Sequence, residues 1–296
     1  MRRRDLAAVV LPGGLWVEGV CHKDADLRPL TGEDEAFLLE EGALSLAAKT
    51  TAILFRCLTR LGSLDTITME MVGSLSVGDR EALLLNLRRL TLGDRMQCVL
   101  RCPELSCGEV MDLDLRASRF LLPPYNRSQE CYEAAISEDE ELYCVTFRLP
   151  NGADQEAAAY LSQSDPEAAA NMLLNRCIKQ VTIKGGEGEV LMRKEDILID
   201  WQPSQREQIS MAMAEVDPQA EIRLNLSCPS CGHSFSAIFD TATFFFQEIS
   251  RRINRLYEEV HWLAFYYHWS EAEIMGMTSK KRLMYLDFLS DTLSRR

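Results

Sequence analysis

The sequence has no long hydrophobic run and only 4 histidines. No stretch approaches the ~20 apolar residues that span a bilayer, so we expect no membrane span. The apolar segment near the N-terminus covers only residues 6–11 before a Pro-Gly-Gly sequence, which is too short for a signal peptide. We therefore expect a cytoplasmic protein.

Positive charge is also scarce. Lys and Arg number 32 against 45 Asp and Glu, which gives a formal net charge of −13. Binding to nucleic acid requires clustered Lys and Arg against the phosphates, so the composition argues against a nucleic-acid partner. An excess of acid favours solubility or a basic protein partner.

Recognisable catalytic motifs are missing. The sequence contains no P-loop, no nucleophile elbow, no HExxH and no GxGxxG after a strand. Gly-Gly-Glu-Gly at 185–188 lacks the following Lys-Ser/Thr, and the acidic run at 138–141 is typical of a solvated loop. His261 and His268 share one helix face and are compatible with a metal pair, but their aromatic neighbours favour packing. We expect no enzyme, no catalytic residue and no small-molecule substrate.

Cysteine, in contrast, is plentiful. Six of the 10 cysteines stand singly in apolar surroundings without the regular spacing of a disulfide framework: Cys21, Cys57, Cys98, Cys131, Cys144 and Cys177. This usage fits a reducing cytosol.

The other four cysteines form two short knuckles far apart in the chain. The first reads Cys102-Pro-Glu-Leu-Ser-Cys107-Gly, and the second reads Cys228-Pro-Ser-Cys231-Gly-His. One tight turn can present two thiolates to a metal, and glycine after the second Cys allows the positive φ that ends such a turn. Four thiolates suit a tetrahedral Zn²⁺ site, so the sequence predicts structural zinc at these residues.

Two alternatives remain open for the knuckles. The thiols can be reduced and pack as small hydrophobic groups, and His233 can replace one thiolate, although a hydrogen bond from His233 to a sulfur is favoured. A complete set of four thiolates leaves no open coordination position, which favours a structural metal over a catalytic one.

The order of motifs predicts an α+β fold that is mainly helical. Apolar, strand-like runs flank both knuckles, so we expect a split zinc ribbon that carries a large α/β insertion. The predicted division is an N-terminal strand and helical part with the first knuckle (1–115), the inserted α/β domain (116–221), the second knuckle (222–240) and a C-terminal helical module (241–296).

Hydrophobic periodicity and caps predict the individual elements. We expect strands within 8–20, helices over 33–46, 50–61 and 80–90, and a short strand within 66–75. In the insertion we expect a strand over 143–149 and helices over 154–161, 166–180 and 206–214. One long amphipathic helix is predicted from residue 241 to 267, followed by two shorter helices that begin after Ser270 and Thr278.

Several stretches resemble one known family. They are LRPLTGEDE (27–35), LSVGDREALLLNLRRLTLGD (75–94), VTFRLPNGADQEAA (145–158), LLNRC (173–177) and the two Cys-Pro knuckles. Together they resemble the baseplate hub assembly chaperone family of T-even-like contractile phage tails and phage-tail-like contractile injection systems. YHWSEAEIMGMTSKKRLMYL (267–286) resembles a small helical module that also occurs as a separate protein in such tail clusters. The four residues between Cys102 and Cys107 depart from the usual two.

This resemblance implies a non-enzymatic assembly factor or structural component of a contractile tail baseplate. Its partners would be baseplate hub, tail-tube or other tail proteins, and it would be cytoplasmic during assembly and then either released or retained in the particle. The alternative is a zinc-ribbon regulator that binds nucleic acid. The acidic residues beside the knuckles, Glu104, Glu109, Asp112, Asp114 and Asp240, count against that alternative.

Overall fold

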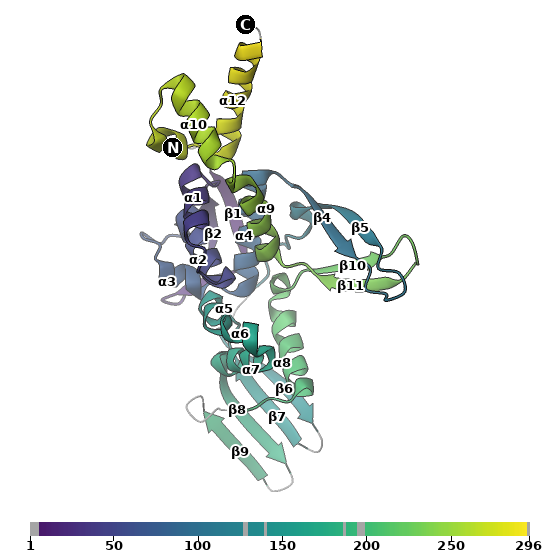
Figure 1. Ribbon diagram of the computed structural model, residues 1–296. Coiled ribbons are helices and arrows are strands. Elements are labelled where there is room, and N and C mark those ends of the chain that lie inside the picture. The colour runs from purple at the N-terminus through teal and green to yellow at the C-terminus, as the bar shows by residue number, and fades with distance from the viewer. Residues whose placement is uncertain (1–5, 127–129, 139–140, 186–187, 194–198, 295–296) are drawn as a thin grey trace.

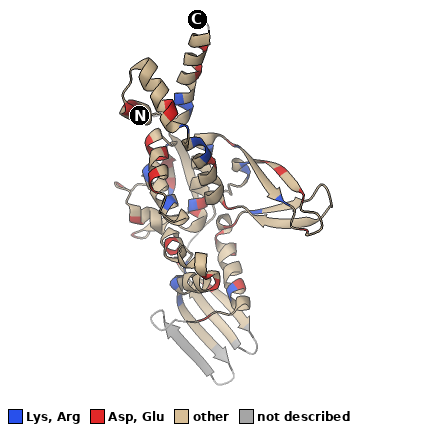
Figure 2. Cartoon of the chain, in the orientation of Figure 1, with Lys and Arg blue, Asp and Glu red and all other residues tan. Residues whose placement is uncertain are grey.

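The protein has an α+β fold of two similar halves, each of which ends in a hairpin, followed by a C-terminal helical module (Figure 1). A computed structural model describes residues 6–126, 130–138, 141–185, 188–193 and 199–294. Acidic and basic residues are interspersed along the helices (Figure 2). No helix within these ranges is both long and apolar enough to cross a membrane.

The first half consists of a three-stranded antiparallel sheet, its helices and a hairpin. The sheet order is β1-β2-β3, with β1 at Ala7–Val17, β2 at Val20–Leu27 and β3 at Leu58–Leu61. The helices are α1 (Gly32–Glu40), α2 (Leu46–Cys57), α3 (Met69–Ser74) and α4 (Val77–Leu92). The hairpin follows as β4 (Arg95–Arg101) and β5 (Val110–Arg116).

The second half has a similar order of elements, with β9 in the place of α3 and one additional short helix, α6. Its four-stranded sheet has the order β6-β7-β8-β9, from β6 (Tyr132–Glu138), β7 (Glu141–Phe147), β8 (Ile178–Gly185) and β9 (Gly188–Arg193). The helices are α5 (Gly152–Ala158), α6 (Leu161–Ser164), α7 (Pro166–Cys177) and α8 (Pro203–Val216). A hairpin of β10 (Arg223–Ser227) and β11 (Ser234–Ile238) again closes the unit.

A buried ion-pair cluster marks the first half. Asp34 has no exposed side-chain surface and accepts hydrogen bonds from Arg28 and Arg56. The Arg28 backbone N–H donates to the Cys57 carbonyl at 3.0 Å where β2 meets the end of α2.

The same cluster recurs in the second half. Asp154 is also fully buried and accepts from Arg148 and Arg176, and the Arg148 N–H donates to the Cys177 carbonyl at 3.0 Å. The four residues Arg148, Asp154, Arg176 and Cys177 correspond to Arg28, Asp34, Arg56 and Cys57. The number of residues that separates the two members is the same for every pair. The pairing of β7 with β8 also has a register shift at the position equivalent to the shift between β2 and β3. The chain therefore contains an internal structural repeat.

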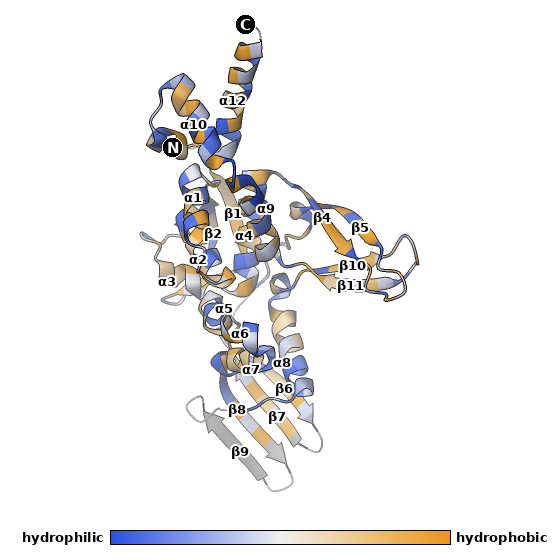
Figure 3. Ribbon diagram, viewed as in Figure 1, coloured by the Kyte–Doolittle hydropathy of each residue, from blue (hydrophilic) through white to orange (hydrophobic). Residues whose placement is uncertain are grey.

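Each repeat has its own hydrophobic core. The first core combines the sheet with α2 and α4, and α9 (Thr241–Ile253) covers it through Phe245, Phe246, Ile249 and Ile253. The second core is built on Val145, Phe147, Val181, Trp201 and Ile209. A third core joins the hairpins to α4 through Leu85, Met96, Ile222, Leu224 and Phe239, and apolar residues line the hairpin strands (Figure 3).

The C-terminal module contains α10 (Leu256–Tyr267), α11 (Glu271–Met275) and α12 (Ser279–Ser294). The prediction of one helix over 241–267 is wrong, because the chain breaks between α9 and α10 at Asn254 and Arg255. Ile253 packs in the first core and Leu256 packs in the module, so the chain changes direction between two separate cores. The helix predicted to begin after Ser270 is confirmed, and Ser270 and Glu273 form its capping box.

Other elements also differ from the sequence predictions in type or in their bounds. The strand predicted within 66–75 is helix α3, which Thr68 caps. The helix predicted over 33–46 ends at Glu40, and the next begins at Leu46. The helices predicted over 50–61 and 166–180 end at Cys57 and Cys177, because the following residues pair as β3 and β8. The four-part division at residues 116, 222 and 241 stays a prediction.

Candidate metal centre

The first knuckle closes the β4–β5 hairpin. The Cys102 N–H donates to the Glu109 carbonyl at 2.8 Å, which continues the hairpin ladder. The Cys107 N–H donates to the Glu104 carbonyl at 2.9 Å, and Gly108 has φ +59°. Since an L side chain rarely adopts this φ, glycine allows the turn to bring Cys107 back toward Cys102.

The second knuckle closes the β10–β11 hairpin in the same way. The Cys228 N–H donates to the His233 carbonyl, and the Gly232 N–H donates to the Cys228 carbonyl, both at 2.9 Å. Gly232 has φ +73°. The two hairpins occupy equivalent places in the two repeats and lie side by side (Figure 1).

The structure brings all four cysteines of the knuckles together. Their Sγ atoms lie within 4.8 Å of one another, with 3.8 Å between Cys102 and Cys231 and 3.7 Å between Cys107 and Cys228. Thiolates bound to one tetrahedral zinc at about 2.3 Å would stand about 3.8 Å apart. A disulfide would need about 2.05 Å. The arrangement therefore has the dimensions of a four-thiolate zinc site.

The thiols differ in burial and in acidity. Cys102 and Cys228 are buried, Cys107 is half-buried and Cys231 is exposed. The N–H of Cys231, with that of Ser230, lowers the pKa of Cys228 to about 7, whereas burial raises the pKa of Cys102 to about 12. Because thiolates this close repel one another, ionisation of all four requires a cation between them.

His233 does not belong to this cluster. Its Nδ1 lies 3.9 Å from Glu104 Oε2, and its ring stacks on Phe235 with 6.2 Å between ring centroids. The backbone N–H of His233 donates to the Cys231 sulfur. The predicted contact between His233 and a sulfur thus involves the main chain rather than the ring.

Apolar contacts hold the two knuckles in place. Met111, Leu100 and Phe235 pack around the sulfur atoms. Closer to the body of the protein, Phe239 stacks on Phe120 with 5.5 Å between ring centroids. The two hairpins therefore contact each other through apolar side chains as well as through the thiol cluster.

Other candidates from the sequence have no such arrangement. Within the described ranges, the four cysteines are the only group of three or more possible metal ligands. His261 is exposed and lies beside the exposed rings of Trp262 and Phe265 rather than in packed surroundings, and His268, also exposed, ends α10 in the left-handed region. The Gly-Gly-Glu-Gly segment and the acidic run each lie partly outside the described residues.

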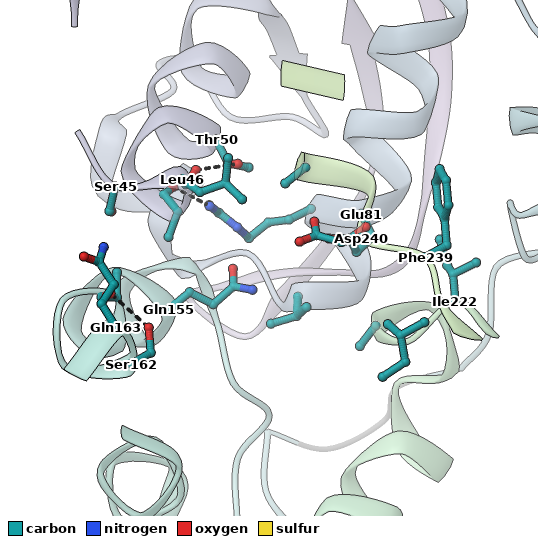
Figure 4. A pocket seen from close by; sticks show the side chains of 17 residues that line it. Ser45, Leu46, Thr50, Glu81, Gln155, Ser162, Gln163, Ile222, Phe239 and Asp240 are labelled. Carbon is teal, nitrogen blue, oxygen red and sulfur yellow. Dashed lines mark hydrogen bonds between the residues drawn. The ribbon is translucent and has the colours of Figure 1, made fainter. Parts of the chain in front are cut away.

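A cleft lies where the two repeats and the base of the hairpins meet (Figure 4). Thr50 and Glu81 line it from the first repeat, and Gln155 lines it from the second. Burial raises the pKa of Glu81 to about 7. Arg80, also in the wall, is 2% exposed. Sequence reasoning missed this junction. A usable signal was the pattern Arg-x-x-x-Gly-x-Asp, which occurs at residues 28–34 and again at residues 148–154.

The fold and the thiol cluster define an α+β protein of two repeats whose equivalent hairpins meet at one candidate metal centre. A family model described as "T4 bacteriophage base plate protein" matches residues 22–246. The chain belongs to this family of T4-like baseplate proteins. The match ends within α9, so the C-terminal module lies beyond it. No curated protein and no solved structure matches the chain.

Proposed function

We propose that the protein is a non-enzymatic assembly factor or structural component of a contractile tail baseplate, in a phage or an injection system. Membership of the baseplate family is the observation that carries this proposal. Its partners are hub, tail-tube or other tail proteins, which it binds in the cytoplasm during assembly. The nucleic-acid alternative has no observation in its favour, since acidic residues such as Glu104 and Glu109 flank the first knuckle.

In this proposal Cys102, Cys107, Cys228 and Cys231 hold one structural Zn²⁺. The sulfur separations of 3.7 and 3.8 Å support it, as does the placement of two thiols in each repeat. Zinc would neutralise the thiolates and fix one hairpin against the other. Structural zinc contributes roughly 10 kcal/mol or more in small domains, which is comparable with the whole stability of a typical domain.

Metal content tests the zinc centre. Protein purified without added metal should contain about one zinc per chain by elemental analysis. A Cys228→Ser variant should lose the metal and melt at lower temperature, because three thiolates bind zinc less tightly. Cys98→Ser is the matched control, since Cys98 lies in β4 outside the cluster and this variant should keep its zinc. Metal-free protein with four reactive thiols would contradict the zinc proposal.

Purified particles test the role in assembly. We expect a gene deletion to block baseplate formation and complementation to restore it. Mass spectrometry of mature particles then distinguishes the two proposed roles. A structural component would be present in the particles, whereas a released assembly factor would be missing from them. Normal particles from the deletion strain would refute the proposal.

A further inference from the structure

The junction between the two repeats is a turn that docks onto a helix start. The N–H of Gly152, the first residue of α5, donates to the Leu75 carbonyl at 3.2 Å. Arg80 then packs over this glycine, and a Cβ on Gly152 would lie only 2.2 Å from Arg80 Nη1. Residues 75–80 are called here the docking turn, and residues 151–154 the receiving helix start.

The C-terminal module makes the same contact with the first repeat. The N–H of Gly32, the first residue of α1, donates to the Met277 carbonyl at 3.0 Å. Arg282 lies as far beyond Met277 as Arg80 lies beyond Leu75, and a Cβ on Gly32 would lie 3.0 Å from Arg282 Nη1. Residues 277–282 are therefore a second docking turn, and residues 31–34 are its receiving helix start.

The sequence around the two receiving starts is similar. Both follow the pattern Arg-x-x-(Thr/Asn)-Gly-x-Asp, with Arg28 to Asp34 in one and Arg148 to Asp154 in the other. In each, the aspartate caps its own helix and pairs with the arginine. Glycine is required at the first helical position because the arginine of the docking turn occupies the space of a side chain.

A third docking turn lies in the second repeat at residues 201–206. Trp201 is buried like Leu75, Gln202 and Gln205 form a capping box before α8, and Arg206 stands where Arg80 stands in α4. Gln202 and Pro203 are exposed. In the part of the chain that is described, no backbone N–H donates to the Trp201 carbonyl.

Helix α7 carries a buried polar atom that lacks a hydrogen-bond partner among the described residues. In the first repeat Thr51 accepts a hydrogen bond from Arg80 and donates one to Glu156 of the docked repeat. Asn171 is the equivalent of Thr51, and its Oδ1 is buried with no hydrogen-bond partner among the described residues. Nη2 of Arg206 is 3.7 Å from Oε2 of the Glu167 side chain. In the first repeat, the equivalent of Glu167 is Ala47, and Nη2 of Arg80 donates to the backbone carbonyl of Ala47 at 3.1 Å.

We infer that the turn at 201–206 docks a receiving helix start supplied by another protein, with the sequence pattern Arg-x-x-(Thr/Asn)-Gly-x-Asp. The occupant is a different protein rather than a second copy, because both receiving starts of this chain are already occupied within it. The partner's glycine N–H would bond the Trp201 carbonyl, and a donor from its first turn would bond Asn171. This inference rests on the proposed assembly role for the kind of partner and not on the zinc.

A peptide that carries the chain's own receiving start is the probe. Residues 146–164 would be titrated into ¹⁵N-labelled full-length protein and followed by NMR. We expect shifts at the Gln202 N–H, the Arg206 side chain and the Asn171 amide, with a millimolar or tighter Kd. A Gly152→Val peptide and an Arg206→Ala protein should each weaken binding at least about tenfold, which corresponds to ~1.4 kcal/mol. Arg251→Ala, at an exposed position of α9, should bind normally.

Three results would overturn the inference. They are no shifts at millimolar peptide, equal shifts with the Gly152→Val peptide, and shifts confined to residues 75–80, where the peptide would displace the internal contact. Self-association that Arg206→Ala abolishes would identify a second copy as the occupant and equally overturn it. Zinc content and particle assembly are separate measurements, so failure of this docking would leave the proposed function intact.

Discussion

At the scale of residues, two buried aspartates organise the repeats. Burial alone would raise the pKa of Asp34, but hydrogen bonds from Arg28 and from the Thr31 N–H, with the charge of Arg28, hold it below its ordinary value. The same balance lowers the pKa of Asp154, where Arg148 acts first. Each carboxylate also caps the helix that it begins. A single short side chain thus connects a strand end, a helix start and a neighbouring helix.

The lowered pKa of Asp34 predicts a specific response to acid. A carboxyl group with a lower pKa in the folded state adds stability above its unfolded value of about 3.9, and this stability is lost as pH falls through the folded pKa. Asp34→Asn should cost about 3–5 kcal/mol at pH 7, because two arginines lose their partner. Its free energy of unfolding should then fall less than that of the wild type between pH 5 and 3.

Urea unfolding across this pH range measures the effect. Asp291→Asn is the control, since Asp291 is exposed on α12 and this variant should follow the wild type. Any metal held by the four clustered cysteines would be lost in acid from all three proteins alike, so its loss cancels in the comparison. Equal acid dependence in wild type and Asp34→Asn would show that the carboxylate does not stabilise the fold in this way.

At the scale of elements, the sequence predicted those features that depend on neighbouring residues better than those that depend on residues distant in the chain. Both hairpins and the capping box that begins α11 depend on neighbouring residues, and the sequence located them correctly. β3 was predicted as helix because Leu58 and Leu61 continue the apolar spacing of α2. Pairing with β2, distant in sequence, decides its conformation instead.

The candidate metal centre shows the same division. Each Cys pair and its glycine are a local motif, so the sequence predicted which residues would meet. The repeat and its docking turns escaped prediction, because contacts such as Arg80 with Gly152 join distant segments and few residue identities are shared. The packing of the two equivalent hairpins against each other depends on contacts between distant segments, so the local sequence does not predict it.

The contact between α4 and α5 predicts an intolerance to side chains at the helix start. Gly152→Ala should destabilise the protein by about 1–3 kcal/mol, because Arg80 must move and give up hydrogen bonds to Thr51 and Ala47. Gly73→Ala is the matched control, since no atom lies within 4 Å of its added Cβ inside α3. The control should be neutral or gain up to ~1 kcal/mol. Thermal unfolding of both variants measures this, and equal stability would argue against a tight junction.

At the scale of the whole molecule, the protein is a chain of docked units closed by one clasp. The C-terminal module docks on the first repeat and the first repeat docks on the second, both through a glycine at a helix start. The thiol centre joins the same two repeats at a separate place, through their hairpins. Two junctions at separate places fix the repeats relative to each other more firmly than either could alone.

X-ray absorption at the zinc edge of the purified protein tests the central claim most directly. We predict four sulfur neighbours at about 2.3 Å and no nitrogen, because His233 lies outside the thiol cluster. The spectrum of Cys98→Ser should be unchanged. A mixed sulfur and nitrogen shell, or a protein that takes up no zinc at all, would contradict a clasp made by Cys102, Cys107, Cys228 and Cys231.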